Sequence, residues 1–226
     1  MDQIKSAPKA TGILLFLLLL NILNMVDRTL ITSFGSAIIK DLNLSDSQFG
    51  LLTGPIFVFF YSIMGLFMGA LADRVHRPRL IAAGLLLWSA LTAVSGMAKS
   101  FVQIGVARLF IGVGESAMTP SAISMISDLF PKARRGTATG IYYLGVPLGA
   151  GGSFIVAGIL GPMIGWRNCF FLLGGIGVVL ALGLLCLKDP KRGAMEEKED
   201  SMAPEQEEDL LGGDWRRVIS DVFLVV

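Results

Sequence analysis

The most informative pattern in this chain is a series of long apolar runs separated by short polar segments. The first run opens with unbroken apolar sequence from Ile13 to Leu20. A membrane-spanning helix needs roughly 20 apolar residues, so each run is long enough to cross a bilayer. None of them alternates regularly between polar and apolar positions, which disfavours a β-barrel. The runs predict six transmembrane helices, at about 11–35, 48–71, 79–98, 101–126, 137–162 and 168–188.

The start of the chain does not resemble a cleaved signal peptide. Its apolar stretch is too long, lacks an obvious small-residue cleavage site and continues through Asp27 and Arg28. We therefore interpret the stretch as the first membrane helix.

Basic residues outside the runs predict the orientation of the chain. Of the 19 Lys and Arg residues, 14 fall in alternate segments, whereas only Lys40, Lys99 and Arg167 fall in the intervening ones. Cytoplasmic loops of membrane proteins carry an excess of Lys and Arg. Both termini are therefore predicted to be cytoplasmic, and we expect an integral protein of the bacterial inner (cytoplasmic) membrane.

Composition agrees with a fold made entirely of membrane helices. The 226 residues are 53% hydrophobic and only 16% charged, and their mean hydropathy is +0.67, whereas soluble domains are about a quarter charged. The formal net charge of +1 argues against a nucleic-acid partner, because such binding needs a concentrated basic face. The lipid bilayer is the partner that this composition predicts.

The apolar character ends after Leu187 and divides the chain into three expected parts. Residues 1–188 form a six-helix bundle, 189–217 an acidic cytoplasmic interdomain linker, and 218–226 the beginning of a seventh membrane helix. We therefore expect one half of a larger protein, whose C-terminal half is missing. The alternative is a complete six-span protein that acts as a homodimer or as a regulatory partner.

Four ionisable residues lie within the runs: Asp27, Arg28, Arg108 and Glu115. Each costs on the order of 2.5–3.5 kcal/mol at the centre of a membrane helix, which makes it a functional candidate. Asn24 shares a helix face with Arg28, because the two are four residues apart. We expect Asp27 to pair with Arg108, and Glu115 to lie deeper, within reach of Arg28 or water.

These residues suit a proton-coupled carrier, in which a carboxyl group inside the membrane exchanges protons. We predict that Asp27 and Glu115 couple protons to transport. Arg28, Arg108 and Asn24 would balance their charge and contact the substrate. The alternative is a static polar clamp that fixes helix packing.

Small residues and prolines interrupt the fourth and fifth runs. Small residues let membrane helices approach closely, and a proline loosens the backbone hydrogen bonding of a helix. The combination predicts helices that slide or bend against each other, and plain tight packing is the alternative. The residues concerned are Gly112, Gly114, Pro120, Gly145, Pro147 and Gly149.

Two loops resemble signatures of the major facilitator superfamily. The segment from Gly69 to Arg79 has the family's glycine, three residues, Asp-Arg and basic cluster between the second and third helices, with His76 where the family usually has glycine. The segment Asp128–Gly136 resembles the family's loop between the fourth and fifth helices. The resemblance implies a gate that controls the outward-open state, formed by Gly69, Asp73, Arg74, Arg77, Arg79, Asp128 and Arg135.

The charged pairs narrow the resemblance to one branch. Asp27-Arg28 in the first helix and the Gly112–Glu115 segment in the fourth are similar to the spinster-like branch, whose eukaryotic members move lysophospholipids or sphingosine phosphate. The family implies two six-helix halves, a central cavity faced by the acids and Arg108, proton-linked transport and alternating access. The expected cargo is a small organic or amphiphilic, lysophospholipid-like molecule. A sugar, an organic acid or an exported drug is the alternative.

Nothing in the chain predicts an enzyme, a cofactor or a metal site. The single histidine, His76, lies in a loop, and Cys169 and Cys186 do not have the spacing of metal ligands. There is no Ser/His/acid set and no phosphate-binding glycine loop.

Overall fold

The computed structural model of the protein describes residues 2–196, with side chains from Lys9 onward. Within this range all regular elements are helices. The expected beginning of a seventh helix at 218–226, and the predicted linker beyond Glu196, lie outside the described residues.

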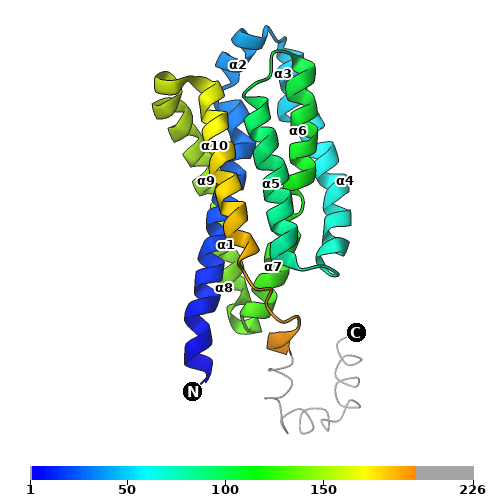
Figure 1. The fold of residues 1–226 in the computed structure, drawn as a ribbon, viewed down its shortest axis with the longest axis vertical. Coiled ribbons are helices and arrows are strands. Elements are labelled where there is room, and N and C mark those ends of the chain that lie inside the picture. The colour runs from blue at the N-terminus through cyan, green and yellow to red at the C-terminus, as the bar shows by residue number, and fades with distance from the viewer. Residues whose placement is uncertain (1, 197–226) are drawn as a thin grey trace, which may run out of the picture.

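Successive helices run up and down along one axis and form a bundle (Figure 1). α1 (Asp2–Ser33) rises from the N-terminus and is followed by the short helix α2 (Gly35–Leu42). The next passes are α3 (Asp46–Thr53) with α4 (Pro55–Ala72), α5 (Arg77–Ser95), and α6 (Phe101–Glu115) with α7 (Met118–Leu129). The last are α8 (Lys132–Tyr143), α9 (Gly145–Ile155) and the π-helical turn η1 (Val156–Leu160) in one pass, and α10 (Gly161–Leu185).

Among the described residues, five helical stretches are long and apolar enough to cross a membrane, and the last one contains two of the six predicted helices. It runs from Lys132 to Leu185, 54 residues, which would measure about 80 Å if straight, against about 30 Å for the bilayer core. The chain reverses at Gly165, whose φ of 78° and ψ of 159° lie outside the helical region. α8 and α9 therefore rise and α10 descends beside α5 (Figure 1), as the two separate runs predicted.

Breaks within three of the passes are explained by proline. A proline lacks the N–H that would bond to the carbonyl four residues earlier, and its ring clashes with that carbonyl. Pro55 begins α4 directly after the break at Gly54. Pro120 lies four residues after Ser116, where α6 has ended, and Pro147 lies three residues after the break at Leu144.

The helix α2 was not expected from the sequence, which extended the first span only to residue 35. α2 ends at Asn43, which takes the left-handed conformation (φ 50°) common after a helix. Ser45 and Gln48 then form a capping box that begins α3. A short polar segment thus turns the chain at the upper end.

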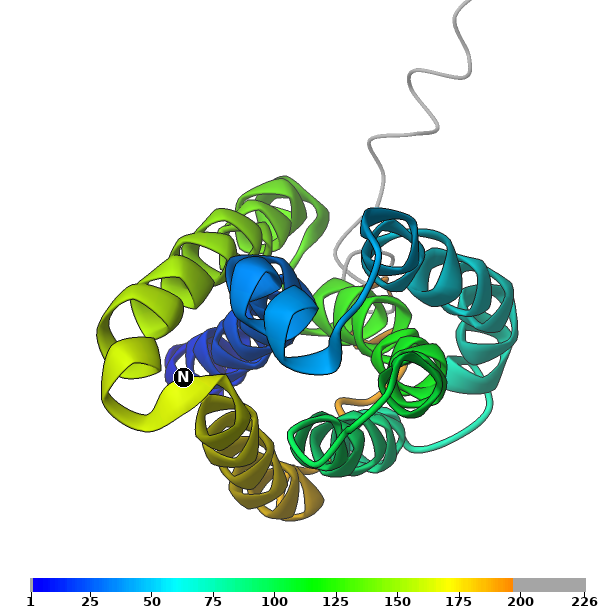
Figure 2. The ribbon, with the colours of Figure 1, turned by 90° about the horizontal axis from the view of Figure 1, so that it is seen from above.

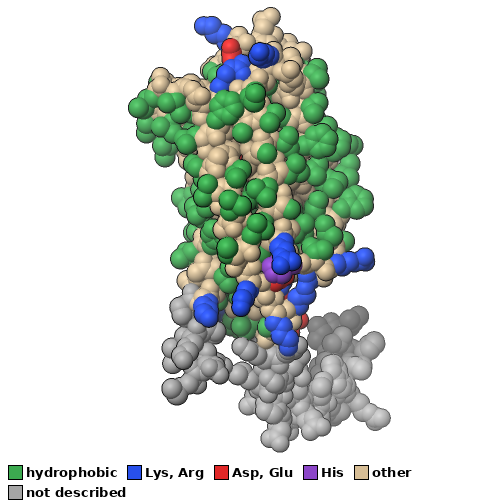
Figure 3. Space-filling view, in the orientation of Figure 1, with side chains coloured by type: hydrophobic (Ala, Val, Ile, Leu, Met, Phe, Trp, Pro, Cys, Tyr) green, Lys and Arg blue, Asp and Glu red, His purple; other side chains and the backbone are tan. Residues whose placement is uncertain are grey.

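The bundle is apolar both inside and outside. Trp88, Leu17 and Leu30 are fully buried, while Leu66 and Met163 are 79% and 74% exposed. Hydrophobic side chains cover the middle of the face shown in Figure 3, and Lys and Arg gather at its two ends. This distribution is that of an integral membrane protein, because lipid solvates the exposed apolar belt.

Viewed along the axis, the helices surround α1 and α7, which lie toward the middle (Figure 2). α1 packs against α9, α6 packs against α4 and α5, and α10 packs along α5. This arrangement brings the polar residues of α1 and α6 together inside the bundle.

Candidate functional site

Arg28 and Glu115 form an ion pair inside the bundle. The guanidinium atoms Nε and Nη2 of Arg28, on α1, lie 2.9 and 2.8 Å from the carboxylate Oε2 of Glu115, at the end of α6. The side chain of Glu115 is fully buried, whereas that of Arg28 is 25% exposed. The expectation that Arg28 reaches Glu115 is confirmed. Pairing of this kind is what makes a buried charge tolerable.

Two aromatic rings of α4 lie against the arginines. Phe57 and Tyr61 stack with their ring centroids 5.5 Å apart. The Cζ atom of Arg28 lies 4.8 Å from the centroid of Phe57 and 4.4 Å from that of Tyr61, and the Cζ of Arg108 lies 5.0 Å from Phe57. A cation over an aromatic face is attracted by the ring quadrupole. Neither ring was predicted from the sequence, although their spacing of four residues places them on one helix face.

The expected pair between Asp27 and Arg108 is wrong. Arg108 instead donates from Nη2 to the backbone carbonyl oxygen of Arg28, at 3.0 Å. Consecutive residues project about 100° apart around a helix, so Asp27 points away from Arg28 and lies beside Trp88 of α5. Arg108 is held on the Arg28 side by the carbonyl and by Phe57.

Asp27 is therefore buried without a hydrogen bond. It is 3% exposed, and both of its carboxylate oxygens lack a hydrogen-bond partner among the described residues. The Nε1 atom of Trp88 and the Nε atom of Arg108 are also without a partner in that range. Buried polar groups are nearly always bonded, so a cluster of unbonded groups deserves a functional explanation.

The two asparagines of α1 have different surroundings. Asn21 donates from Nδ2 to the backbone carbonyl of Tyr142, at 2.8 Å, and so ties α1 to α8. Asn24 is 3% exposed, and its Nδ2 has no hydrogen-bond partner in the described part of the chain. Asn24, one turn before Arg28, thus has an amide N–H group without a hydrogen-bond partner among the described residues.

The glycines expected to give flexibility lie where two helices are in close contact. A Cβ atom on Gly112 would lie 3.0 Å from the carbonyl oxygen of Phe57, and one on Gly149 would lie 2.5 Å from that of Ile22. Gly114 and Gly145 are equally confined, against Gly84 and Asn21. These contacts show tight packing, and the role of the glycines and of Pro120 and Pro147 in helix bending stays a prediction.

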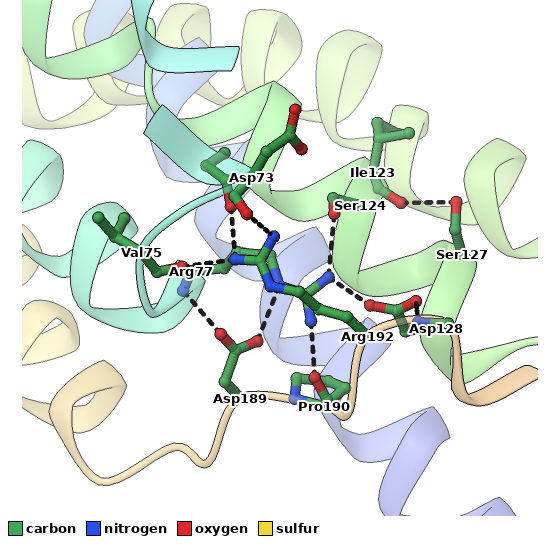
Figure 4. A network of polar contacts seen from close by, with 12 residues as sticks. Asp73, Val75, Arg77, Ile123, Ser124, Ser127, Asp128, Asp189, Pro190 and Arg192 are labelled. Atoms are coloured by element: carbon green, nitrogen blue, oxygen red, sulfur yellow. Dashed lines mark hydrogen bonds and ion pairs between the residues drawn. The ribbon is translucent and has the colours of Figure 1, made fainter. Parts of the chain in front are cut away.

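Arg77 is the centre of a polar network at the lower end of the bundle (Figure 4). Its side chain is fully buried and forms ion pairs with Asp128 and Asp189. Its Nε and backbone N–H donate to the carboxylate of Asp189 at 2.8 and 2.9 Å. Nη1 donates to Ser124 Oγ at 2.9 Å and Nη2 to the Pro190 carbonyl at 2.6 Å. We call these residues, together with Arg192, the lower network.

Arg192 adds a cap to the end of α4. The last carbonyls of a helix have no intrahelical donor, and here the guanidinium of Arg192 supplies one. It donates to the carbonyl oxygens of Ala72 and Val75, both at 2.7 Å, and to that of Asp73. A cation is also favourable at the negative end of the helix dipole. Arg192 thereby holds the first residues of the predicted linker against α4.

The predicted gate residues fall into two groups. Arg77 and Asp128 contact each other, and Asp73 takes part through its backbone. Arg135 donates to the carbonyl of Phe130 at 3.1 Å and lies 3.5 Å from Glu196. The others are peripheral: Arg74 and Arg79 are exposed, and a Cβ on Gly69 would meet open space.

Asp189 and Arg192 were missed because the acidic composition of their segment predicted a solvated linker. The available signal was the cluster Asp-Pro-Lys-Arg directly after the sixth apolar run.

A second polar cluster, the upper clamp, closes the opposite end of the bundle. The carboxylate oxygen Oδ2 of Asp41 accepts a hydrogen bond from Trp166 Nε1 at 3.0 Å and lies 2.9 Å from Nη2 of Arg167. Nη1 of Arg167 donates to the carbonyls of Gly96 and Ala98, at 2.9 and 2.6 Å. The sequence placed Asp41, Trp166 and Arg167 outside the predicted membrane helices but did not predict their contact.

The described residues contain no group of three or more His, Cys, Asp or Glu side chains that could hold a metal ion. The chemistry of the central site is therefore that of its carboxylates, guanidinium groups, amides and aromatic rings.

Comparison with known proteins assigns the chain to a family. Residues 17–226 match the family model of the Major Facilitator Superfamily. An MFS-type efflux pump of Mycolicibacterium smegmatis is 30% identical over 210 residues, which cover 93% of this chain and 48% of the pump. Protein spinster homolog 1 of Homo sapiens is 31% identical over 185 residues, covering 80% of this chain and 35% of that protein. The chain thus spans half or less of the length of these relatives.

A solved structure supports both the fold and the assignment to the spinster-like branch. It is that of a bacterial homologue of the human lysosomal transporter Spinster in an inward-facing and unoccupied conformation. It superimposes with a TM-score of 0.73 at 36% identity, over 82% of this chain and 44% of that one. The chain therefore belongs to the Major Facilitator Superfamily, in its spinster-like branch, and corresponds to the N-terminal half of that fold.

Proposed function

We propose that this chain is the N-terminal half of a proton-coupled secondary active transporter for a small organic or amphiphilic, lysophospholipid-like substrate. A second six-helix half would complete the carrier. The substrate would lie between the halves, and rocking of one half against the other would expose it to each side in turn. The lower end, which carries most of the basic residues, would face the cytoplasm.

The ion pair between Arg28 and Glu115 is the observation that carries this proposal. Glu115 is fully buried, yet its partner is 25% exposed, so the pair connects the interior of the bundle with its accessible side. A static clamp would be built at lower cost from neutral side chains, because inserting each charge into a membrane helix is expensive. Protonation of Glu115 would break the pair and free the guanidinium of Arg28.

Charge balance suggests how a proton and an anionic substrate would be linked. Asp27 and Glu115 together balance Arg28 and Arg108 when all four groups are ionised. A proton on either acid leaves one positive charge, which a phosphate or carboxylate headgroup can neutralise. Arg28 offers the planar, multiply donating fork that suits such groups. In this mechanism a carboxylate and a substrate anion compete for the same arginine.

Unbonded groups beside the pair would serve the same cycle. The carboxylate oxygens of Asp27 and the Nδ2 atom of Asn24 are buried and lack hydrogen-bond partners among the described residues. Asp27 would hold the second proton, and Asn24 would contact the polar part of the substrate. Phe57 and Tyr61 would provide an apolar wall next to the headgroup.

The choice of cargo rests on these features and on the relatives. A partly exposed arginine next to aromatic rings suits a molecule with an anionic head and an apolar body. The human relative is a spinster homologue, and the mycobacterial relative is an MFS-type efflux pump. Sugars, organic acids and exported drugs are the alternative cargoes.

The lower network would act as the gate of the cycle. Arg77, Asp128 and Asp189 tie the start of α5 to the end of α7 and to the residues after α10. We expect this network to define the state in which the cytoplasmic side of the carrier is closed.

The test is Glu115→Gln in the complete carrier, that is, this chain with a second six-helix half, reconstituted in vesicles. We expect substrate binding to remain measurable while uptake loses its dependence on an imposed proton gradient. Glu196→Gln is the matched control, since Glu196 is an exposed acid at the lower end. Unchanged gradient-dependent uptake in Glu115→Gln would refute the proton role. Turnover by the 226-residue chain alone would favour a homodimer.

A further inference from the structure

A groove between α1 and α10 lies at the lower end of the bundle, away from the central site. Its volume is about 460 Å³, within the range of about 300–1,000 Å³ typical of small-molecule sites. It is lined by Lys9, Gly12, Ile13, Phe16, Gly183, Cys186, Leu187 and Lys188. The walls are apolar, and among the described residues that line the groove only Lys9 and Lys188 are charged.

Two glycines create the hollow. A Cβ on Gly12 would meet nothing within 4 Å, and one on Gly183 would meet only the ring atom Cζ of Phe16, at 3.7 Å. The groove therefore does not result from two backbones in tight contact. It is open space along the seam of two helices, of a shape that an acyl chain can fill.

Two lysines give the groove a positive charge. Lys9 and Lys188 are both exposed, and no ion pair of either is found among the side chains that the structure describes. Arg77 and Arg135, at the same end, each have an acidic partner. Lys and Arg gather at this end of the face shown in Figure 3, below the apolar belt. That border is where lipid headgroups lie.

A second depression on α10 provides the comparison. It has a volume of about 550 Å³ and is lined by Phe171, Leu172, Gly175, Ile176, Val179 and Leu180. No charged residue lines it, so it offers lipid an apolar surface without a partner for a phosphate group.

We propose that the groove between α1 and α10 binds an anionic phospholipid of the leaflet at the lower end. Its phosphate lies between Lys9 and Lys188, and one acyl chain lies over Gly12 and Gly183. Basic pockets between membrane helices on the cytoplasmic side are suited to acidic headgroups. The site is independent of transport, because none of its residues belongs to the central site or to the lower network.

A cysteine of the chain can report whether the groove is occupied. Cys186 lines the groove and is exposed, whereas Cys169 is buried. With the protein in phosphatidylcholine nanodiscs, a neutral maleimide should label Cys186 more slowly when phosphatidylglycerol replaces part of the lipid. Cys186→Ser should abolish the labelling, which assigns the signal to this residue. An equal rate in both lipids would overturn the proposal.

Binding is measured directly as phosphatidylglycerol retained on the protein in native mass spectrometry. We expect the double variant Lys9→Gln/Lys188→Gln to lose about 30-fold in affinity, or about fivefold for each lysine. The double variant Lys9→Arg/Lys188→Arg should keep the binding, which separates lost charge from misfolding. Lys99→Gln, at the opposite end, should have no effect. Equal retention by the Gln and Arg double variants would overturn the proposal.

Shape is tested separately from charge. Gly12→Leu should fill the groove and reduce the retention of phosphatidylglycerol at least tenfold. Gly175→Leu fills the uncharged depression and should leave the retention of phosphatidylglycerol unchanged. Both positions have open space for a side chain, so both variants should fold. If the two variants lose phosphatidylglycerol equally, or if Gly12→Leu loses none, the groove is not the site.

Discussion

Gly84 of α5 and Gly114 of α6 face each other with no room for a side chain between them. A Cβ atom on Gly84 would lie 2.5 Å from the carbonyl oxygen of Gly114, and one on Gly114 would lie 2.8 Å from the carbonyl oxygen of Gly84. Glu115 directly follows Gly114 and pairs with Arg28. This close contact of two backbones therefore sets the position of the buried carboxylate.

We expect Gly114→Ala to destabilise the protein. The added methyl group must push α6 away from α5, and overpacking of this kind costs about 1–3 kcal/mol. Gly140→Ala is the control, because a Cβ there meets nothing within 4 Å, and alanine is favoured over glycine in a helix by up to about 1 kcal/mol. Thermal unfolding in detergent should rank Gly140→Ala above the parent and Gly114→Ala below it. Equal stability of the two variants would contradict the packing described here.

Asp27→Asn should separate stability from function. The substitution removes a buried charge that has no hydrogen-bond partner among the described residues, and burying such a group costs free energy. We expect the unfolding temperature to rise by about 2–4 °C, while gradient-driven uptake by the complete carrier falls. Asp41→Asn is the control, because Asp41 is bonded to Trp166 and Arg167 and its loss should not stabilise the protein. A fall in stability of Asp27→Asn with normal uptake would indicate a structural clamp.

Arg108 should be sensitive to the shape of its side chain as well as to its charge. It donates to the carbonyl of Arg28 and lies over the ring of Phe57. Lysine keeps the charge but lacks the planar fork, so uptake should decrease from Arg108 to Arg108→Lys and further to Arg108→Ala. The measurement is the initial rate of uptake at saturating substrate. Equal rates for the Lys and Ala variants would show that the charge is unimportant.

Arg192→Gln should loosen the end of α4. Three carbonyl oxygens lose their donor, and a carbonyl that is left unsatisfied where it is shielded from water costs about 1–3 kcal/mol. Amide hydrogen exchange should therefore accelerate near residues 72–75. Arg79→Gln is the control, since Arg79 lies near the same end of the bundle but is exposed in the first turn of α5. Unchanged protection in Arg192→Gln would mean that the cap does not hold the helix.

The sequence predicts the path of the chain well because the bilayer imposes a strong pattern. The apolar runs located the membrane passes, and the cost of buried charge singled out Asp27, Arg28, Arg108 and Glu115. The partners of these residues were harder to predict. Spacing within one helix gives the angle between its own side chains, but the rotation of one helix against another depends on packing. Asp27 and Arg108 were paired wrongly for this reason.

Composition also conceals short ordered segments. The predicted linker is acidic as a whole, yet Asp189 and Arg192 at its beginning are bound to Arg77 and to the end of α4. The average composition of a segment of some thirty residues does not reveal that two of its residues bind specific partners. The rings of Phe57 and Tyr61 were missed for a related reason, because an aromatic residue in a membrane helix has no special signal until a cation lies over it.

The two polar clusters have a joint consequence for the antiparallel helices α5 and α10. Arg77 begins α5 and binds Asp189 just after α10, while Arg167 near the start of α10 binds the carbonyls of Gly96 and Ala98 just after α5. Between these points the backbone of Gly174 lies against Ser89. α5 and α10 are thus held together near both of their ends and at the middle. Neither helix can slip lengthwise without breaking both polar clusters at once, so we expect this helix pair to act as the rigid frame of the bundle.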